Sequence, residues 1–250
     1  MAITLKRQLT NEEKERVLEI HGRTCFATGH TIPDDEPIHF DHIRAFADEG
    51  QSELDNIAPM CERHNKAKGA LPLEDFRVKL RLQDFFSRGD ELTLQHLLEY
   101  LKAKDDIDTY GENVLVEEHA NQVHVESNVI SESYVLYECP LTKWKYFYAT
   151  LPVAILNSDD ARDEVKGLQP RYLIFKKVFE MYRHFQHAPV LQPSIVRVHK
   201  GKILVFDGQH KIAALLWTRR RVFECKIYLD VDVRKLNQTN ISAHDKFSQT

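Results

Sequence analysis

The sequence predicts an α+β protein with a small N-terminal unit of two strands and a helix, a helical connector, and a larger C-terminal α+β domain. Three observations support this. Residues 40–69 combine strand-like and helix-like segments with many polar side chains, residues 103–113 form an acidic break that contains a glycine, and the apolar period then changes from helical to strand-like. We therefore expect boundaries at 1–70, 71–112 and 113–250.

The composition is that of a globular protein. The chain has 250 residues and 42% hydrophobic residues, enough for a core. Its first 25 residues contain no long apolar segment, so we expect neither a signal peptide nor a membrane partner, and a cytoplasmic location. The four cysteines lie far apart, which favours reduced thiols over a disulfide framework.

Charge is unevenly distributed along the chain. Residues 1–131 carry 15 Lys and Arg against 26 Asp and Glu, whereas residues 132–250 carry 19 against 12. The C-terminal half is therefore the better candidate for holding a polyanion.

The N-terminal unit begins with a predicted helix and continues into a strand. Thr10 and Glu13 have capping-box spacing, and apolar residues follow on one side of the helix. A turn-rich segment then leads into the apolar run 38–40, which predicts a strand that ends with Asp41 and His42.

Residues 40–69 contain the side chains best suited to chemistry. A second strand and then a helix from Arg63 would bring Asp41, His42 and Asn65 together. Asp41 and Asn65 offer hard oxygen ligands for a magnesium-type ion, as phosphodiester hydrolysis requires. His42, on the opposite face of the strand end, could accept a proton from water near neutral pH.

The motifs DHI, NIAPMC and HNKAKG, in this order and spacing, resemble the HNH endonuclease family with its ββα-metal fold. The resemblance implies that Asp41 is a metal ligand for Mg²⁺ or Mn²⁺ and that His42 is the general base. It further implies that Asn56 shapes the loop and orients the base, and that Asn65 is the second metal ligand. His64 is the alternative ligand if the register shifts by one residue.

Many members of that family also bind a structural zinc ion through two CxxC pairs. Here the corresponding segments read CFAT from Cys25 and CERH from Cys61 to His64, so three of four ligands remain. A fourth ligand would have to be His30 or a water. We expect Cys25 and Cys61 to be small buried apolar residues rather than parts of a zinc site.

The rest of the chain predicts helices and then mixed structure. Helical spacing is found at 71–86, 94–101 and 170–186, strand-like runs at 114–116, 123–125, 134–137, 143–148, 194–198 and 203–206, and a hairpin turn at CPLT from Cys139.

The stretch VFDGQHKIAALLW at 205–217 predicts a strand, a tight turn and a helix. Gly208 permits the turn, and the amides at the helix start could receive an anion. The stretch resembles the Asp-Gly-x-His-Arg motif of the ParB/sulfiredoxin-like superfamily, which implies that a phosphate or nucleotide is bound by Asp207, Gly208, Gln209, His210 and Lys211. Lys211 replaces the usual arginine and loses its bidentate fork. In the alternative interpretation, the turn only joins strand to helix.

These patterns favour a metal-dependent HNH nuclease that cleaves or nicks DNA, with a ParB-like domain that recognises DNA or senses a nucleotide. Family analogy suggests phage defence. Two rivals remain open: a nucleotide-switched DNA-binding regulator with a structural HNH domain, and a ParB-like nucleotide triphosphatase. DNA is the expected partner, and a nucleotide, a second copy of the chain and a defence-system protein remain open.

Overall fold

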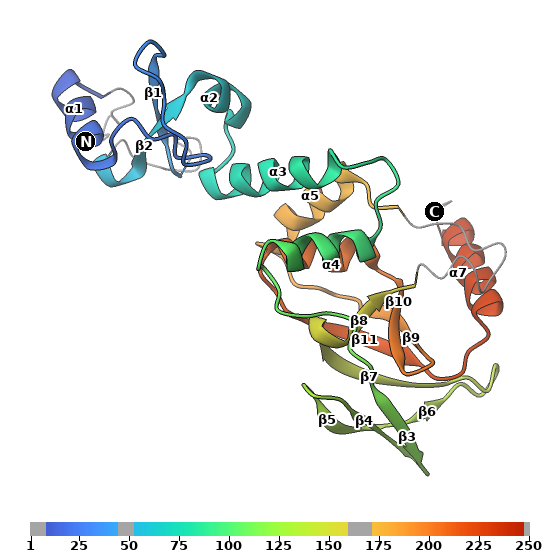
Figure 1. Ribbon diagram of the computed structural model, residues 1–250. Coiled ribbons are helices and arrows are strands. Elements are labelled where there is room, and N and C mark those ends of the chain that lie inside the picture. The colour runs from blue at the N-terminus through green and yellow to red at the C-terminus, as the bar shows by residue number, and fades with distance from the viewer. Residues whose placement is uncertain (1–8, 45–52, 160–171, 248–250) are drawn as a thin grey trace, which may run out of the picture. The chain divides into compact units, whose positions relative to one another are not determined.

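The computed structural model describes residues 9–44, 53–159 and 172–247. The chain divides into two compact units, Met1–Asp84 and Phe85–Thr250 (Figure 1). The expected connector, residues 71–112, is shared between them: α3 (Leu73–Phe86) lies almost wholly in the first unit and α4 (Leu94–Ala103) in the second. No helix in the described ranges is long and apolar enough to cross a membrane.

The first unit has the predicted order of two strands and a helix. Helix α1 (Asn11–His21) begins with the expected capping box, in which the Glu13 amide donates to Thr10 Oγ1 at 3.3 Å and the Thr10 amide donates to Glu13 Oε2 at 2.7 Å. Strand β1 (Ile38–His42) pairs antiparallel with β2 (Ile57–Cys61), which follows a 3₁₀ turn, η2 (Leu54–Asn56). Helix α2 (Glu62–Lys68) continues directly from β2.

The core of the first unit lies against β2. Every residue of β2 is buried, whereas every residue of β1 is only half-buried. The cluster consists of Cys25, Ala27, Ile32, Met60, Cys61, Leu73 and Phe76. Because β1 lies at the margin of this core, side chains at its end can contact both other residues of the unit and solvent.

The second unit is built on a six-stranded mixed sheet in the order β6-β7-β11-β9-β10-β8. These strands are β6 (Tyr137–Glu138), β7 (Lys145–Pro152), β11 (Val222–Tyr228), β9 (Ser194–His199), β10 (Lys202–Asp207) and β8 (Leu156–Ser158), with a 3₁₀ turn, η3 (Val153–Ile155), before β8. A second, antiparallel sheet contains β3 (Leu115–His119), β4 (Gln122–Glu126) and β5 (Ser131–Val135). The β6–β7 connection is the predicted hairpin turn, closed by a bond from the Cys139 amide to the Trp144 carbonyl.

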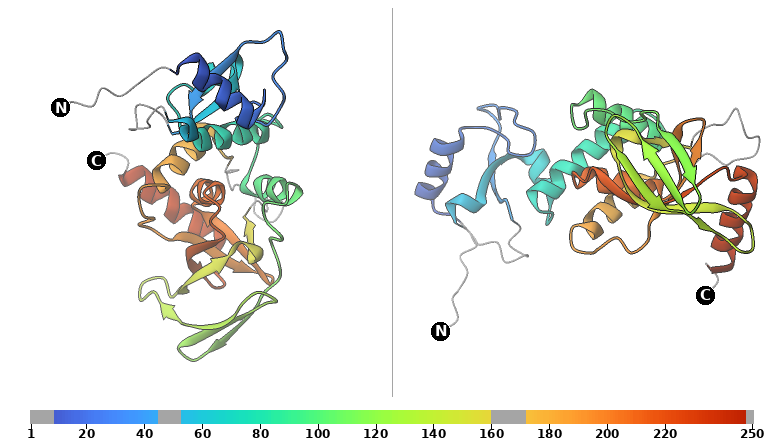
Figure 2. Two further views of the ribbon diagram at one scale, coloured as in Figure 1. Left: turned by 90° about the vertical axis from the view of Figure 1, so that its left-hand side faces the viewer. Right: turned by 90° about the horizontal axis from the view of Figure 1, so that it is seen from below.

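Helix α6 (Gln209–Trp217) is the most buried helix of the second unit among those described. Seven of its residues are buried, and α4 and α5 (Phe175–Phe185) pack against it (Figure 2). The fourth helix, α7 (Val233–Phe247), follows β11. Since α6 begins two residues after β10 ends, the DGQHK stretch is fixed between a buried strand and a buried helix.

The second unit differs from the sequence prediction in one strand that was not predicted and in two predicted elements whose bounds differ. Strand β11 was not predicted, although its alternating burial places Phe223, Cys225 and Ile227 in the core, because Glu224 and Lys226 interrupt the apolar signal. The predicted strand 134–137 is divided between β5 and β6. Helix α5 begins at Phe175, while residues 170 and 171 of the prediction lie outside the described residues.

Candidate functional site

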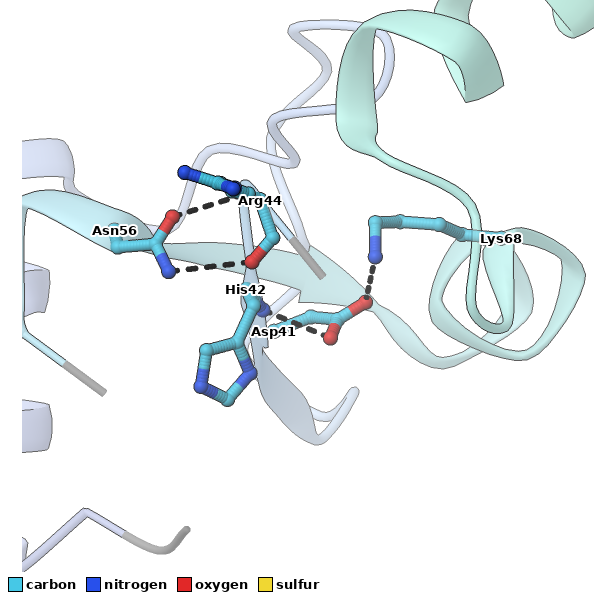
Figure 3. Close-up of polar contacts among 5 residues, drawn as sticks. All are labelled: Asp41, His42, Arg44, Asn56 and Lys68. Atoms are coloured by element: carbon cyan, nitrogen blue, oxygen red, sulfur yellow. Dashed lines mark hydrogen bonds and ion pairs between the residues drawn. The ribbon is translucent and has the colours of Figure 1, made fainter. Parts of the chain in front are cut away.

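Asp41 lies near the end of β1 with both carboxylate oxygens engaged. Its Oδ1 accepts from the His42 amide at 2.8 Å, and its Oδ2 accepts from Lys68 Nζ at 2.8 Å (Figure 3). The Lys68 side chain is 1% exposed and that of Asp41 is 22% exposed. The carboxylate is therefore oriented by a buried ammonium group, and each oxygen keeps a further lone pair. Lys68 was not identified from the sequence.

His42 is the last residue of β1 and is half-buried. Its backbone pairs with Ile57 of β2. Successive side chains of a strand point to opposite faces, and in Figure 3 the imidazole of His42 leaves the strand in a different direction from the Asp41 carboxylate. The two groups can therefore act on different partners.

Asn56 fixes the chain immediately after His42. Its Oδ1 accepts from the Arg44 amide at 2.8 Å and its Nδ2 donates to the Arg44 carbonyl at 3.2 Å (Figure 3). Its own carbonyl accepts from the Ile43 amide at 2.8 Å. These bonds are of the kind that a residue shaping the loop beside the base would make.

Asn65 and His64 lie on α2 but on different sides of it. Asn65 is half-buried, and within the described residues no hydrogen bond joins it to Asp41. His64 is 5% exposed and lies among the cysteines, so it is not beside Asp41 as the alternative register required. Positions 64 and 68 share the buried side of α2 one turn apart, while position 65 is rotated from position 64 by about 100°.

Cys25, Cys61 and His64 form a compact set of metal-binding atoms. The two sulfurs are 3.9 Å apart, and His64 Nδ1 lies 3.3 Å from Cys25 Sγ and 3.4 Å from Cys61 Sγ. Tetrahedral zinc with its usual bond lengths requires about 3.8 Å between sulfurs and about 3.6 Å between sulfur and nitrogen. The spacing therefore fits one ion, which revises our expectation that these cysteines are merely apolar.

His30 completes the set. The ligand atoms of Cys25, His30, Cys61 and His64 all lie within 4.8 Å of one another. Thr28 Oγ1 lies 2.7 Å from His30 Nδ1, which leaves Nε2 free to bind a metal. Thr28 occupies the place of the second cysteine in the first CxxC pair, and its hydroxyl would orient His30 for binding a metal in place of the missing thiolate.

The environment of the cluster affects its protonation. Burial first, and then the positive charges of Arg63 and His30, lower the pKa of His64, which favours the neutral imidazole that a metal binds. Burial raises the pKa of the Cys61 thiol, although its hydrogen bond with His64 opposes this. A metal ion would therefore displace a proton from Cys61 when it binds.

The DGQHK stretch in the second unit lines a cavity of about 690 Å³. All five residues predicted to contact a phosphate or nucleotide border it, which are Asp207, Gly208, Gln209, His210 and Lys211. The opposite wall comes from α5 and the segment after it, with Lys177, His184, Met181, Phe185 and Leu191. The cavity thus combines an apolar wall with basic groups.

Gly208 is required at the turn into α6. It has φ +89°, and a Cβ at this position would lie 2.7 Å from Ser194 Oγ. The next residue, Gln209, is 3% exposed; its Nε2 donates to the Val205 carbonyl, while its Oε1 has no partner among the described residues. The turn thus allows close approach of a ligand to backbone amides.

His210 and Lys211 are held by the protein itself. His210 Nε2 accepts from the Ile174 amide at 3.0 Å, and Lys211 Nζ donates to the Gln192 carbonyl at 2.7 Å. Burial lowers the pKa of both side chains. A ligand anion in this cavity would therefore also need Lys177, an exposed cation of α5 that was not identified from the sequence.

Comparison with known proteins bears on the first unit only. Residues 23–71 match the HNH endonuclease family. The match covers β1, β2 and α2 together with the Cys25 hairpin, and it supports a nuclease that acts on DNA with a divalent metal. No curated protein matches the chain. The matched segment ends before the second unit, so the resemblance of the DGQHK stretch to the ParB/sulfiredoxin-like superfamily stays a proposal.

Proposed function

We propose that the protein is a metal-dependent HNH nuclease that cleaves or nicks DNA. In this proposal Asp41 and Asn65 hold Mg²⁺ or Mn²⁺, and His42 is the general base. The observation that best supports it is the Asp41 carboxylate, which is fixed at a strand end next to His42 within the segment that matches the HNH family.

The residues divide the work of phosphodiester hydrolysis between them. The bound ion would stabilise negative charge on the phosphate oxygens and the leaving group. His42 takes the proton from the attacking water, whose oxygen bonds to phosphorus as the bond to the leaving oxygen breaks. Asn56 holds the chain at Arg44 and so limits the movement of His42, and Lys68 keeps the Asp41 carboxylate oriented.

The cysteine and histidine cluster is proposed as a structural zinc site. Cys25 and His30 come from the hairpin before β1, whereas Cys61 and His64 come from the junction of β2 and α2. One ion would therefore tie the hairpin to the helix that carries Asn65 and Lys68. Its donor set of two sulfurs and two nitrogens suits Zn²⁺.

Plasmid cleavage tests the nuclease proposal. With Mg²⁺ or Mn²⁺ the wild type should nick or cut the plasmid, and His42→Ala should be slower by about 10²- to 10⁴-fold, the usual contribution of a general base. His119→Ala is a matched control because His119 is an exposed histidine of β3 in the second unit. Equal rates for wild type and His42→Ala would reject His42 as the base.

The cavity at Asp207–Lys211 supports a second candidate function, the binding of a nucleotide or phosphate that regulates the protein or is hydrolysed. Calorimetric titration with nucleoside triphosphates and inorganic phosphate should detect binding that Lys177→Ala weakens. Lys176→Ala is the control, because Lys176 is the next residue along α5 and its exposed ammonium pairs with Glu180. Triphosphate hydrolysis lost only in Asp207→Ala would favour the triphosphatase, whereas no binding at all would remove this candidate.

A role in phage defence, with a second copy of the chain or a defence-system protein as partner, remains a hypothesis by family analogy.

A further inference from the structure

One face of the six-stranded sheet carries four tyrosines around a single lysine. Tyr137 of β6 pairs with Tyr146 of β7, and Tyr146 pairs with Tyr228 of β11, so these three side chains form a row across three strands. Two residues along the strands, Tyr148 pairs with Lys226. Because directly paired residues point to the same side of a sheet, all five belong to one surface, here called the tyrosine face.

The core of the unit does not require these tyrosines. The alternate residues of β7 and β11 point to the other side of the sheet, where Phe147, Phe223 and Ile227 are at most 1% exposed. On the tyrosine face, Tyr137 is 45% exposed and Tyr148 is 49% exposed. Large aromatic rings left half open on a sheet suggest a contact surface rather than packing.

Helix α7 covers the part of the sheet next to Tyr228 but does not cover Tyr137 and Tyr148. An apolar cluster around Val233 and Leu236 of α7 packs on Trp144, Ile195 and Tyr228. Tyr228 therefore borders the covered region, while Tyr137 and Tyr148 are outside this cluster. Figure 1 shows α7 beside the sheet.

Lys226 places a positive charge among the rings. Its Nζ lies 4.1 Å from the centre of the Tyr146 ring, 5.1 Å from that of Tyr228 and 5.8 Å from that of Tyr148. These are cation–π distances, and they hold the ammonium over the aromatic surface. Glu224, two residues earlier on β11, is engaged by Arg220. The tyrosine face therefore suits an anionic ligand and disfavours a cationic one.

We infer that the tyrosine face binds a single-stranded segment of nucleic acid. Exposed bases would stack on Tyr137 and Tyr148, and Lys226 would attract a phosphate of the same strand. A duplex fits less well, because its bases are already stacked on one another. The unit Phe85–Thr250 as a whole carries 22 Lys and Arg against 22 Asp and Glu, so the charge that would attract the strand is local to Lys226. This inference does not depend on the nuclease proposal, because it concerns binding by another unit.

Fluorescence anisotropy with a labelled oligothymidine and a labelled duplex of the same length tests the inference. The full chain carries His42→Ala and no divalent ion is added, so cleavage does not interfere. The single strand should bind more tightly than the duplex, and Tyr137→Ala with Tyr148→Ala should weaken single-strand binding about tenfold or more. Lys226→Met should weaken binding and flatten its salt dependence, whereas Lys226→Arg should retain both.

Two controls separate binding from folding. Replacing Tyr137 and Tyr148 by leucine keeps apolar bulk but removes the aromatic rings, and should weaken binding as alanine does; phenylalanine should retain it. Leu141→Ala, at a residue 89% exposed in the adjoining hairpin, should change nothing. The inference is overturned if the folded double variant binds the single strand as tightly as its parent, or if it loses affinity for the duplex to the same extent as for the single strand. It is also overturned if a proline-rich peptide binds the tyrosine face and the oligonucleotide does not.

Discussion

At the scale of single residues, the ion pair of Asp41 with Lys68 joins two side chains that differ in their exposure to solvent. Lys68 is 1% exposed, so its ammonium depends on Asp41, whereas the Asp41 side chain is 22% exposed and can still contact water. Removing either partner should therefore have different consequences. A buried charge without a partner is far more costly than a partly solvated one.

We predict that Asp41→Asn is more destabilising than Lys68→Met. Asp41→Asn leaves a buried ammonium without its counter-charge, which should cost about 3–5 kcal/mol in the free energy of unfolding. Lys68→Met keeps apolar bulk and leaves a carboxylate that water can reach, which should cost about 2 kcal/mol. Chemical denaturation measures both. Equal losses, or a larger loss for Lys68→Met, would contradict the ion pair as described.

The cleavage assay adds a second readout for Lys68. With Lys68→Met, the carboxylate no longer shares its charge with an ammonium, so a lower concentration of Mg²⁺ should reach half-maximal cleavage. A residue important only for folding would lower the amount of active protein without changing that concentration.

The residues of the candidate site were not equally predictable from sequence. Asp41, His42 and Asn56 could be placed on a strand end and the following loop, because an apolar run and motif spacing are local signals. The contact of Lys68 with Asp41 requires knowing which side of α2 is buried, and tertiary packing determines that side. His64 was assigned to two sites, and only its packing against Cys25 and Cys61 decides between them.

At the scale of elements, the hairpin at residues 24–31, before β1, brings His30 close to Cys25, Cys61 and His64. Its chain is closed by bonds from the Gly29 amide to the Cys25 carbonyl and from the Cys25 amide to the His30 carbonyl. This closure brings His30, five residues after Cys25, into reach of the other ligands. CxxC spacing does not identify His30, because the position of His30 relative to Cys25 depends on the turn between them.

We predict that the purified protein contains one zinc ion per chain and that its affinity depends on both His30 and Thr28. His30→Ala removes a ligand and should cause the larger loss, whereas Thr28→Val removes only the hydroxyl beside Nδ1 and should lower affinity about 10- to 100-fold. Competition with a chromophoric chelator measures both affinities. Thr31→Val is the matched control, since Thr31 is an exposed threonine of the same hairpin. Protein without bound zinc, or with unchanged affinity in His30→Ala, would reject the site.

A further prediction concerns the turn between β10 and α6. Gly208→Ala should cost about 1–3 kcal/mol, because Gly208 has a positive φ and its new Cβ would lie 2.7 Å from Ser194 Oγ. Gly201→Ala, also at a positive φ but with its nearest contact at 3.4 Å, should cost less. Ser194→Ala should recover part of the stability in the double variant. Denaturation curves for the wild type, the three single variants and the double variant decide this, and an absence of recovery would exclude the close contact as the cause.

At the scale of the whole molecule, the sequence indicated a division but misplaced the helices between the parts. The acidic break at 103–113 suggested a separate connector, yet α4 packs on α6 and β8, and α3 contributes Leu73 and Phe76 to the first core. The sequence pattern of an amphipathic helix predicts that one face is buried, but it does not predict which element covers that face. The long-range pairing of β11 between β7 and β9 was likewise absent from any local signal.

The division at residue 84 leads to a prediction about unfolding. The cluster of Cys25, His30, Cys61 and His64 belongs wholly to the first unit and Gly208 to the second, so their effects on stability should be separable. Calorimetry should give two transitions, because domains with separate cores need not unfold together. A strong zinc chelator should lower only one of them, and Cys61→Ser should lower the same one and make it insensitive to the chelator. Gly208→Ala should lower the other. A single transition that the chelator and both variants shift alike would show that the two units unfold as one.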